Sequence, residues 1–302
     1  MAKKSSGKVS KLLILSSKAG SMSPAVEEKL RSQFADFEVA EFDPKMKLLD
    51  MLAPKSRVVV AGGDGTVGWT VKALVDSDHS LGILGLGTYN NFAGSVGMPK
   101  DLNRAIHAVK NGVPHPVTVG RINGHTFLEV AAIGMFGEAP QLGEAAKDMV
   151  FGKLSERFRK VASSEPFEYH LSGDIEGYGV ALSLVFANTP STGARMTIAA
   201  KTSPIDPYLE LQVHAGESYQ DLLKRMVSSA VGRQNPKQDL GMSFRFRHLR
   251  VETRPRAGAF ADSSRAGRSP AVIEADVGGL QLILPAGELR KQRRVNGSQK
   301  AD

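Results

Sequence analysis

The sequence has no cysteine among its 302 residues. This excludes disulfide bonds, thiolate metal sites and a cysteine nucleophile, so any catalysis must use oxygen, imidazole or amine groups. Aromatic residues make up only 6% of the chain, and no basic and aromatic residues alternate as in a nucleic-acid-binding module. The seven histidines show no ligand spacing such as H-E-x-x-H, which argues against a zinc site. We therefore rank a nucleic-acid role last and predict no nucleic-acid partner.

Long hydrophobic runs are also absent. The longest apolar stretches, at residues 58–61 and 180–187, have the length of strands, whereas a helix needs roughly 18 to 20 apolar residues to span a bilayer. The residues after Met1 include two lysines but no apolar core of the signal-peptide type, and Ala2 excludes N-myristoylation. These features predict a cytoplasmic protein without an integral membrane segment.

Positive charge is the main excess in the composition. The formal net charge is +8, and basic residues gather at residues 147–160, 245–268 and 290–294. An excess of this size favours an anionic partner, which could be nucleic acid, a phosphorylated substrate or an acidic lipid surface. Composition does not choose among them, and a simple solvated face is an equal alternative for each segment.

The first part of the chain alternates strand and helix patterns. Strands are predicted at residues 11–15, 37–42, 57–61 and 81–84, and helices at residues 25–34, 45–52, 66–75 and 102–109. Ser23 and Pro24 form an N-cap followed by proline at the first helical position. Alternation of this kind favours an α/β fold with a doubly wound, Rossmann-like parallel sheet.

The pattern changes near residues 112–116. Beyond this point, short alternating runs at residues 117–122, 127–132, 178–187 and 209–213 are separated by Gly, Asn and Pro turns, and two helical segments interrupt them at 141–161 and 218–231. We predict an α/β domain over residues 1–114, a β-rich domain over 115–290 and a basic tail over 291–302.

A glycine-rich turn follows the predicted strand at residues 57–61. It consists of Gly62, Gly63, Asp64, Gly65 and Thr66, directly before a helix. Backbone without side chains lets several N–H groups approach one oxyanion beside the positive end of a helix. Asp64 would repel a naked phosphate, so it indicates either Mg²⁺ carried by a nucleotide or a proton acceptor near the transferred group. A tight turn with a capping Asp is the structural alternative.

The segment from Gly63 to Gly68 also satisfies G-x-G-x-x-G, the dinucleotide-binding pattern. That pattern requires an acidic residue about 20 positions later, at the end of the next strand, to bind the ribose. Here the strand at residues 81–84 ends in Gly85, Leu86 and Gly87. A Rossmann oxidoreductase is therefore disfavoured.

A second polar glycine loop covers residues 85–93. It follows the next strand, at the edge where ligands of open α/β sheets bind. Thr88 can offer a hydroxyl to a phosphate, and Asn90 and Asn91 present donors and acceptors suited to a nucleobase or ribose. An asparagine that bonds to its own turn is the structural alternative for this loop.

Together the two loops resemble a known family. Residues 58–66, residues 82–93 and Val96-Gly97-Met98-Pro99 are similar to the diacylglycerol kinase catalytic domain, which carries GGDGT and a later GTxN-[DNH]-FA…LGIP. This family includes bacterial lipid kinases and the sphingosine and ceramide kinases, and it is distantly related to NAD kinases and 6-phosphofructokinases. The resemblance implies an α/β ATP-binding domain followed by a β-rich sandwich domain.

Fainter similarity continues through residues 126–134 and 187–190. The resemblance implies that Asp262 is the general base, because it aligns with the aspartate of the family's D-G-E motif, although Ser263 and Ser264 replace the Gly and Glu. Asp206 matches one acid of a D-D-G-x-L segment implicated in a structural Mg²⁺ site, with Pro207 in place of Gly.

Three further positions depart from the family pattern. The turn at residues 16–20 replaces an N-P-x-x-G segment that touches nucleotide, and its Lys18 could still meet a phosphate. Gly85 stands where Pro is usual, and Glu129 stands where Asn is usual.

The resemblance implies an ATP-dependent kinase for a hydroxyl of diacylglycerol or a related lipid, with ATP and Mg²⁺ as cofactors. Its partners would be the lipid and an anionic membrane surface met peripherally, and a homodimer is a possible assembly. The predicted nucleotide-binding residues are Gly62, Gly63, Asp64, Gly65, Thr66, Gly87, Thr88, Asn90, Asn91 and Lys18. Asp64 and Asp262 are predicted to be catalytic, and Asp64 and Asp206 to bind metal.

Two alternatives remain open. An NAD kinase-like phosphotransferase with a soluble acceptor is disfavoured because the loop at residues 87–93 has the lipid-kinase form. A nucleotide-binding module without catalysis is favoured by the altered segment around Asp262.

Overall fold

The computed structural model describes residues 8–134, 166–192, 196–197, 202–215, 242–262 and 264–285. These fall into two compact units, one formed by residues 8–117 with 278–285 and the other by the described part of 118–277. The sequence had placed residues 278–285 in the second domain, and the domain limits remain a prediction. The helices predicted at 141–161 and 218–231, the basic segments at 147–160 and 290–294, and the tail at 291–302 lie outside the described residues.

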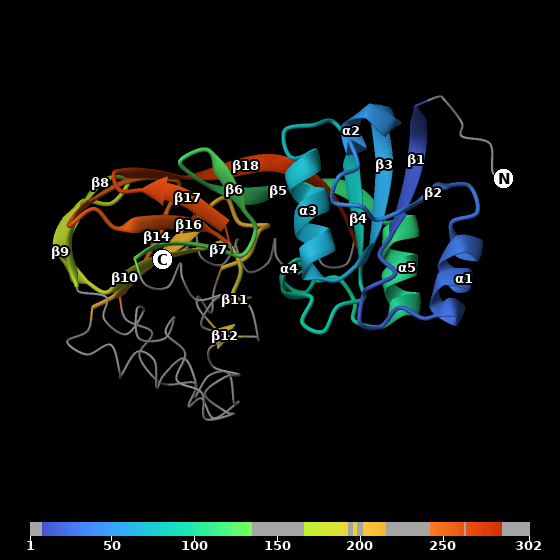
Figure 1. Ribbon diagram of the computed structural model, residues 1–302, viewed down its shortest axis with the longest axis horizontal. Helices are drawn as coiled ribbons and strands as arrows, with labels where there is room; N and C mark the ends of the chain where they lie inside the picture. Colours follow the sequence, from blue (N-terminus) through green and yellow to red (C-terminus); the bar gives the residue numbers. More distant parts are fainter. Residues whose placement is uncertain are drawn as a thin grey trace, which may run out of the picture. The chain divides into compact units, whose positions relative to one another are not determined.

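The first unit contains a parallel sheet, as its sequence pattern predicted. Its strands are ordered β2 (Glu38–Glu41), β1 (Val9–Leu15), β3 (Leu52–Gly62) and β4 (Ser80–Gly85), and all neighbours run parallel (Figure 1). The middle strands are nearly continuous in apolar residues, which is typical of parallel sheets whose two faces are both covered.

Five helices belong to this unit. They are α1 (Pro24–Gln33), α2 (Leu48–Met51), α3 (Asp64–Leu74), α4 (Asn91–Ser95) and α5 (Leu102–Asn111). The N-cap of α1 is Ser23, whose hydroxyl accepts the N–H of Val26 at 3.3 Å, in agreement with the predicted start. Helix α4 was not predicted, because it is a single turn within a loop rich in Asn and Gly and has no helical periodicity to display.

Glycine contacts show that helices cover both faces of the sheet. A Cβ on Gly82 would lie 2.6 Å from Val109 of α5, and a Cβ on Gly62 would lie 2.8 Å from Thr66 of α3. Gly82 pairs with Val59, three residues before Gly62. Because successive residues of a strand point to opposite faces, α3 and α5 lie on opposite faces. The predicted doubly wound fold is confirmed.

Strand β18 (Ala271–Leu284) contributes to both units. Its end pairs in parallel with β4, and its beginning pairs antiparallel with β15 (His248–Arg254). Beyond β15 lie β8 (Phe167–Gly173) and β9 (Gly177–Ala181), while β5 (Val113–Ile122) pairs with β18 and with β6 (His125–Phe127). A strand far away in the sequence therefore extends the first unit's sheet.

The second unit also contains a six-stranded antiparallel sheet. Its order is β14 (Met242–Phe246), β13 (Leu209–His214), β10 (Ser183–Ala187), β7 (Val130–Gly134), β16 (Gly258–Ala261) and β17 (Ser264–Arg268). A short pair, β11 (Ser191–Thr192) with β12 (Met196–Thr197), stands apart from it.

A single hydrophobic core joins the two antiparallel layers of the second unit. It combines Phe167 and Val251 from β8 and β15 with Ile133, Phe186 and Leu211 from the six-stranded sheet, all at most 3% exposed. Side chains from two sheets meeting in one core define a sandwich. The predicted β-rich sandwich is confirmed.

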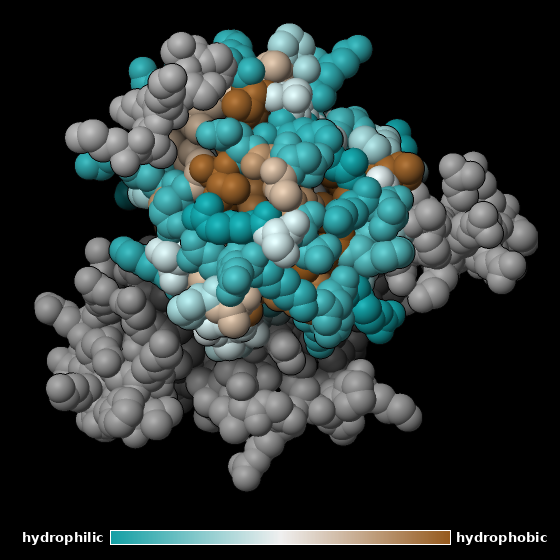
Figure 2. Space-filling model, turned by 90° about the vertical axis from the view of Figure 1, so that its right-hand side faces the viewer, coloured by the Kyte–Doolittle hydropathy of each residue, from teal (hydrophilic) through white to brown (hydrophobic). Residues whose placement is uncertain are grey.

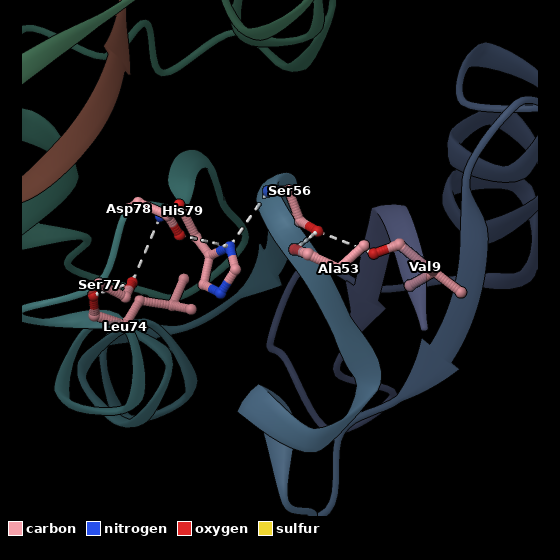
Figure 3. A network of polar contacts seen from close by, with 7 residues as sticks. All are labelled: Val9, Ala53, Ser56, Leu74, Ser77, Asp78 and His79. Atoms are coloured by element: carbon pink, nitrogen blue, oxygen red, sulfur yellow. Dashed lines mark hydrogen bonds and ion pairs between the residues drawn. The ribbon is translucent and has the colours of Figure 1, made fainter. Parts of the chain in front are cut away.

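A buried polar network fastens the amino-terminal edge of the first unit's sheet (Figure 3). The Nδ1 atom of His79 accepts the N–H of Ser56 at 3.1 Å, and the Ser56 hydroxyl lies 2.8 Å from the carbonyl oxygen of Val9. The β1–β3 register shifts at this point, between Val9 and Lys11. His79 directly precedes β4, so this bond joins the start of β4 to β3. The network therefore stabilises the edge of the sheet opposite to the glycine loops.

Among the residues that the structure describes, no helix combines the length and the apolar character needed to cross a membrane. Figure 2 shows a face on which hydrophilic residues predominate and hydrophobic ones lie in small separate patches.

Candidate active site

Three loops of the first unit follow the parallel strands β1, β3 and β4, at residues 16–21, 62–66 and 85–91. Backbone hydrogen bonds join them to one another. The N–H of Leu86 donates to the carbonyl of Gly62 at 2.8 Å, and the N–H of Ser21 donates to the carbonyl of Leu86 at 2.9 Å. The carboxyl ends of parallel strands lie at one edge of a sheet, where ligands of α/β folds bind. The three loops therefore form one connected surface at that edge.

The two glycine loops, at residues 62–66 and 85–91, touch through their backbones. A Cβ on Gly87 would lie 2.8 Å from the Cα of Gly63, which is closer than real Cβ atoms approach backbone. Gly65 is different, because a Cβ there would meet nothing within 4 Å. Gly63 is also the N-cap of α3 and has no side chain to form a cap, so the N–H groups of the first helical turn receive no bond from the cap residue. Such a helix start is suited to binding an anion.

Asp64 fastens the two glycine loops together. Its Oδ2 accepts the N–H of Asn90 at 2.9 Å, and its Oδ1 accepts the N–H of Asn91 at 2.9 Å. Asn91 is the first residue of α4, so the carboxylate also stabilises the positive end of that short helix. Carboxylate oxygens have further lone pairs, so these two bonds leave acceptor capacity for a metal ion.

Asn90 adopts the structural alternative that the sequence had left open. Its backbone is left-handed, with φ at 50°. Its side chain closes the turn on Gly87, because Oδ1 accepts the Gly87 N–H at 2.8 Å and Nδ2 donates to the Gly87 carbonyl at 2.8 Å. Both ends of the amide shape the loop, and the neighbouring Asn91 is buried at 7% exposure.

The two threonines of the loops differ in exposure. Thr66 is 8% exposed, and its hydroxyl donates to the hydroxyl of Ser16 at 3.2 Å. Thr88 is exposed, and its Oγ1 would lie 3.8 Å from a Cβ on Gly20. Lys18, on the first loop, is exposed as well. The polar side chains that these loops present to solvent therefore include Lys18 and Thr88, whereas the Thr66 hydroxyl faces inward.

Asp262 lies in the second unit, directly after β16. Its carboxylate accepts three successive backbone N–H groups, from Leu128 at 3.2 Å, Glu129 at 3.0 Å and Val130 at 3.4 Å. The backbone at Asp262 is left-handed, with φ at 50°. A non-glycine residue in this region is uncommon and is often found at functional sites. The sequence-predicted base is thus a rigidly held carboxylate.

Asp206 takes part in a local turn. Its N–H donates to the carbonyl of Ser203 at 2.9 Å, and its own carbonyl accepts the hydroxyl of Thr118 at 2.7 Å. Within the described ranges, no three His, Asp or Glu side chains gather closely enough to hold a metal ion. Neither Asp64 nor Asp206 therefore belongs to a described metal cage made of protein groups alone.

Ser16 and Asn188 fall within family-like segments of the sequence, but neither was predicted to have a role, whereas the structure places Ser16 beneath Thr66 and Asn188 beside Glu129. Both are polar residues that come immediately after an apolar strand. That position is a signal available in the sequence, because a polar side chain at a strand end is well placed to bond the loops at the same edge.

Comparison with known proteins agrees with this geometry. Residues 12–122, which include the three loops, match the model of the diacylglycerol kinase catalytic domain family. The chain is 28% identical over 163 residues to the diacylglycerol kinase of Bacillus subtilis (strain 168), covering 52% of this chain and 54% of that protein. It is 31% identical over 186 residues to the "Probable lipid kinase YegS-like" of Klebsiella pneumoniae (strain 342), covering 59% and 61%.

Solved structures share the fold. A diacylglycerol kinase from Bacillus anthracis str. Sterne superposes with a TM-score of 0.68 at 18% identity, covering 92% of this chain and 98% of that one. Yeast NADH kinase complexed with NADH superposes with a TM-score of 0.53 at 11% identity, covering 97% and 88%. The family resemblance predicted from the two glycine loops is confirmed, and the chain matches little more than half the length of the first curated relatives.

Proposed function

We propose that this protein is an ATP-dependent kinase that phosphorylates a hydroxyl of diacylglycerol or a related lipid. The observation that carries the proposal is the pair of glycine loops fastened by Asp64 at the carboxyl edge of the parallel sheet. Phosphoryl transfer needs little covalent chemistry from the protein and depends on positioned phosphates and stabilised charge. A rigid glycine cradle beside a helix start supplies both.

The nucleotide side of the reaction is assigned to the first unit. The N–H groups at the start of α3 bind phosphate oxygens, with the open space over Gly65 as the approach. Lys18 and Thr88 supply a cation and a hydroxyl from the neighbouring loops. Mg²⁺, which typically binds to one or two carboxylates together with substrate phosphates, would meet the remaining lone pairs of Asp64 and spread the charge of the γ-phosphate.

The acceptor side is assigned to Asp262. A lipid hydroxyl has a pKa far above 7, so a carboxylate within hydrogen-bonding reach must accept its proton during transfer. The three N–H groups that hold Asp262 fix the direction of its oxygens. Rigid placement matters because proton transfer requires the acceptor within about 3 Å of the donor oxygen.

A lipid acceptor would be met at a membrane surface, and the basic excess supports contact with anionic lipids. In the described part of the segment at residues 245–268, exposed arginines gather around one turn. Arg256 donates from Nε to the carbonyl of Ser269 at 2.9 Å, next to Arg268, and Arg254 is two residues away. A homodimer remains a prediction.

One assay separates the candidate activities. ATP labelled at the γ-phosphate is incubated with Mg²⁺ and a panel of acceptors, namely diacylglycerol, a sphingoid base and ceramide in mixed anionic vesicles, and soluble NAD. We expect label in a lipid, with a rate on vesicles that falls as salt rises. Label in NAD would instead support the soluble-acceptor alternative, which the likeness to NADH kinase keeps in view. Nucleotide binding without labelled product would support a non-catalytic module.

The substitution Asp262→Asn tests the proposed base. An amide cannot accept the hydroxyl proton, so we expect kcat to fall by roughly a hundredfold or more, at the scale of general-base catalysis, while ATP affinity measured by calorimetry stays unchanged. Asp174→Asn, at an exposed turn of the same unit, is the matched control and should keep its rate. Wild-type turnover in Asp262→Asn would remove this carboxylate from the mechanism.

A further inference from the structure

We propose that Asn188 is a positioning residue for the Asp262 carboxylate, an inference that rests on the proposed role of Asp262 as base. Asn188 does not contact Asp262 in any hydrogen bond described above. It acts through the loop at residues 128–130, whose two sides are bonded to different partners. The N–H side of this loop holds Asp262, and the carbonyl side is held by Asn188 and Thr189.

The carbonyl side of the loop receives several donors from this one neighbouring turn. The carbonyl of Glu129 accepts the N–H of Asn188 at 2.9 Å and the N–H of Thr189 at 3.3 Å. The carbonyl of Leu128 accepts Nδ2 of Asn188 at 3.0 Å. Two of the three peptide groups that direct an N–H toward Asp262, those of the Glu129 and Val130 N–H groups, therefore have their carbonyls held by residues 188 and 189.

The Asn188 amide is suited to this task. The side chain is fully buried, at 0% exposed, and its Nδ2 also donates to the carbonyl of Thr118 at 3.1 Å, so it spans two backbone segments. Its Oδ1 is buried without a hydrogen-bond partner in the described structure. Leaving a buried acceptor unpaired costs free energy. We infer that the residue is used for its two donated bonds, which the side chains of Asp, Leu or Ala cannot reproduce.

Sheet topology places the three segments side by side. Strand β7, which begins at Val130, lies between β10 and β16 in the six-stranded sheet. Its register pairs Val130 with Ala187 on one side and Ala131 with Ala261 on the other. Asn188 and Asp262 are the next residues after Ala187 and Ala261. The loop entering β7 is thus flanked by Asn188 on one side and Asp262 on the other, so a shift in one is passed to the other through three residues of backbone.

The main experiment compares Asn188→Ala with Ser183→Ala. Ser183 is a matched control because it is also fully buried on β10 and its hydroxyl donates to the carbonyl of Ile133 on β7 at 3.1 Å, away from the loop. For Asn188→Ala we expect kcat for lipid phosphorylation to fall tenfold or more, with an unchanged KM for ATP. Ser183→Ala should stay within twofold of the wild type.

Hydrogen exchange supplies a readout that does not depend on activity. The amides of residues 128–130 should exchange faster in Asn188→Ala than in the wild type, and those of β4 should keep their rate. If kcat for Asn188→Ala stays within twofold of the wild type, or falls no further than for Ser183→Ala, the inference is overturned. A joint loss of kcat and ATP-binding capacity would indicate general unfolding, and the decision then rests on Thr189→Val.

Thr189→Val covers the case in which Asn188→Ala does not fold. It keeps the backbone N–H bond and removes the hydroxyl, which lies 3.4 Å from the Glu129 carbonyl and also donates to the Ser191 carbonyl at 2.8 Å. We expect a two- to fivefold loss in kcat, and unchanged kcat would count against the inference. The Asp262→Asn variant distinguishes failure of the proposed base from failure of the positioning role of Asn188. If Asp262→Asn retains turnover, Asp262 is not the base. If Asp262→Asn loses turnover while Asn188→Ala and Thr189→Val keep it in full, only the positioning role of Asn188 is refuted.

Discussion

The edge of the parallel sheet in the first unit and the edge of the antiparallel sheet in the second hold an aspartate in the same way. In the first, Asp64 accepts the backbone N–H groups of Asn90 and Asn91. In the second, Asp262 accepts those of three successive residues beginning at Leu128. Consecutive N–H groups from one loop fix a carboxylate more firmly than a single bond, because they restrain both its position and its plane.

The two edges differ in how far apart their partners lie in the sequence. Asp64 is 26 residues from Asn90, within one strand–helix–strand unit, whereas Asp262 is 133 residues from Glu129. The first arrangement also relies on glycines that let Gly63 and Gly87 touch. The second relies on the register of three antiparallel strands and on Asn188. A short sequence motif can therefore indicate the arrangement around Asp64, whereas the arrangement around Asp262 forms only when the antiparallel strands pair.

A third aspartate shows that the bonding pattern alone does not make a site. Asp174 accepts the N–H groups of Arg247 at 2.7 Å and His248 at 3.0 Å, in an exposed turn between β8 and β9. A close glycine contact accompanies it, because a Cβ on Gly173 would lie 2.7 Å from the carbonyl oxygen of His248. Unlike Asp64, however, Asp174 lies between two strands rather than at the start of a helix. Asp174 therefore serves as a reference for what such bonds contribute to stability without a proposed catalytic role.

Of the substitutions considered below, Gly87→Ala should disrupt the contact between the two glycine loops of the first unit most severely. The new Cβ would lie 2.8 Å from the Cα of Gly63 and 2.9 Å from Oδ1 of Asn90, so the two loops must separate. We expect a loss of about 1–3 kcal/mol in the free energy of unfolding, at the scale of overpacking, and at least a tenfold weaker affinity for ATP. Denaturant unfolding and calorimetry measure the two effects.

Gly94→Ala is the matched control for Gly87→Ala. Gly94 lies in α4, and a Cβ there would meet nothing within 4 Å. It should leave ATP affinity unchanged and keep or slightly raise stability, because Ala favours helix. Equal losses in both variants would show that the loop contact is not what matters.

Asp64→Asn should have a smaller effect that separates clamping from metal binding. The amide can accept only one of the two N–H groups and turns its NH₂ toward the other, so we expect a loss of about 1 kcal/mol in stability. If Asp64 also meets Mg²⁺, the ratio of ATP affinities with and without Mg²⁺ should fall toward one. Calorimetric titrations with and without Mg²⁺ measure that ratio.

The control for Asp64→Asn is Asp101→Asn. Asp101 is the N-cap of α5 and accepts the N–H of Arg104 at 2.9 Å. Because Asn caps helices about as well as Asp, stability and the Mg²⁺ dependence should both be preserved. If the ratio of ATP affinities with and without Mg²⁺ is unchanged in Asp64→Asn, Asp64 only holds the two glycine loops together and does not bind the metal.

Asp174→Asn should give the smallest effect and a characteristic pH dependence. The backbone N–H groups of Arg247 and, next, of His248 hold the pKa of Asp174 below its ordinary value of 3.8. A lowered pKa stabilises the folded state above the unfolded pKa, and this contribution is lost as pH falls through the folded pKa. The variant should therefore melt slightly below the wild type at pH 7, and the gap should close as pH falls below 3.8. A gap that persists at low pH would contradict this.

Much of the first unit could be predicted from the sequence because its signals are local. The strand at residues 57–61 and the N-cap at Ser23 rest on runs of a few residues, and the structure has both. Helix α4 escaped prediction because its start is fixed by Asp64 rather than by its own periodicity. The inward-facing hydroxyl of Thr66 was not predicted either, because its partner Ser16 follows a different strand.

The sequence by itself determined the glycine cradle around Asp64, because only glycine permits two backbones to meet as Gly63 and Gly87 do. It also determined the β-rich character of the second unit through alternating strands, whereas the sandwich architecture was implied by the family resemblance. The tertiary structure alone decided that β18 extends the first unit's sheet and that Asn188 and Asp262 flank one loop. These arrangements depend on pairing between strands far apart in the chain, and no local pattern encodes which distant strand will be the neighbour.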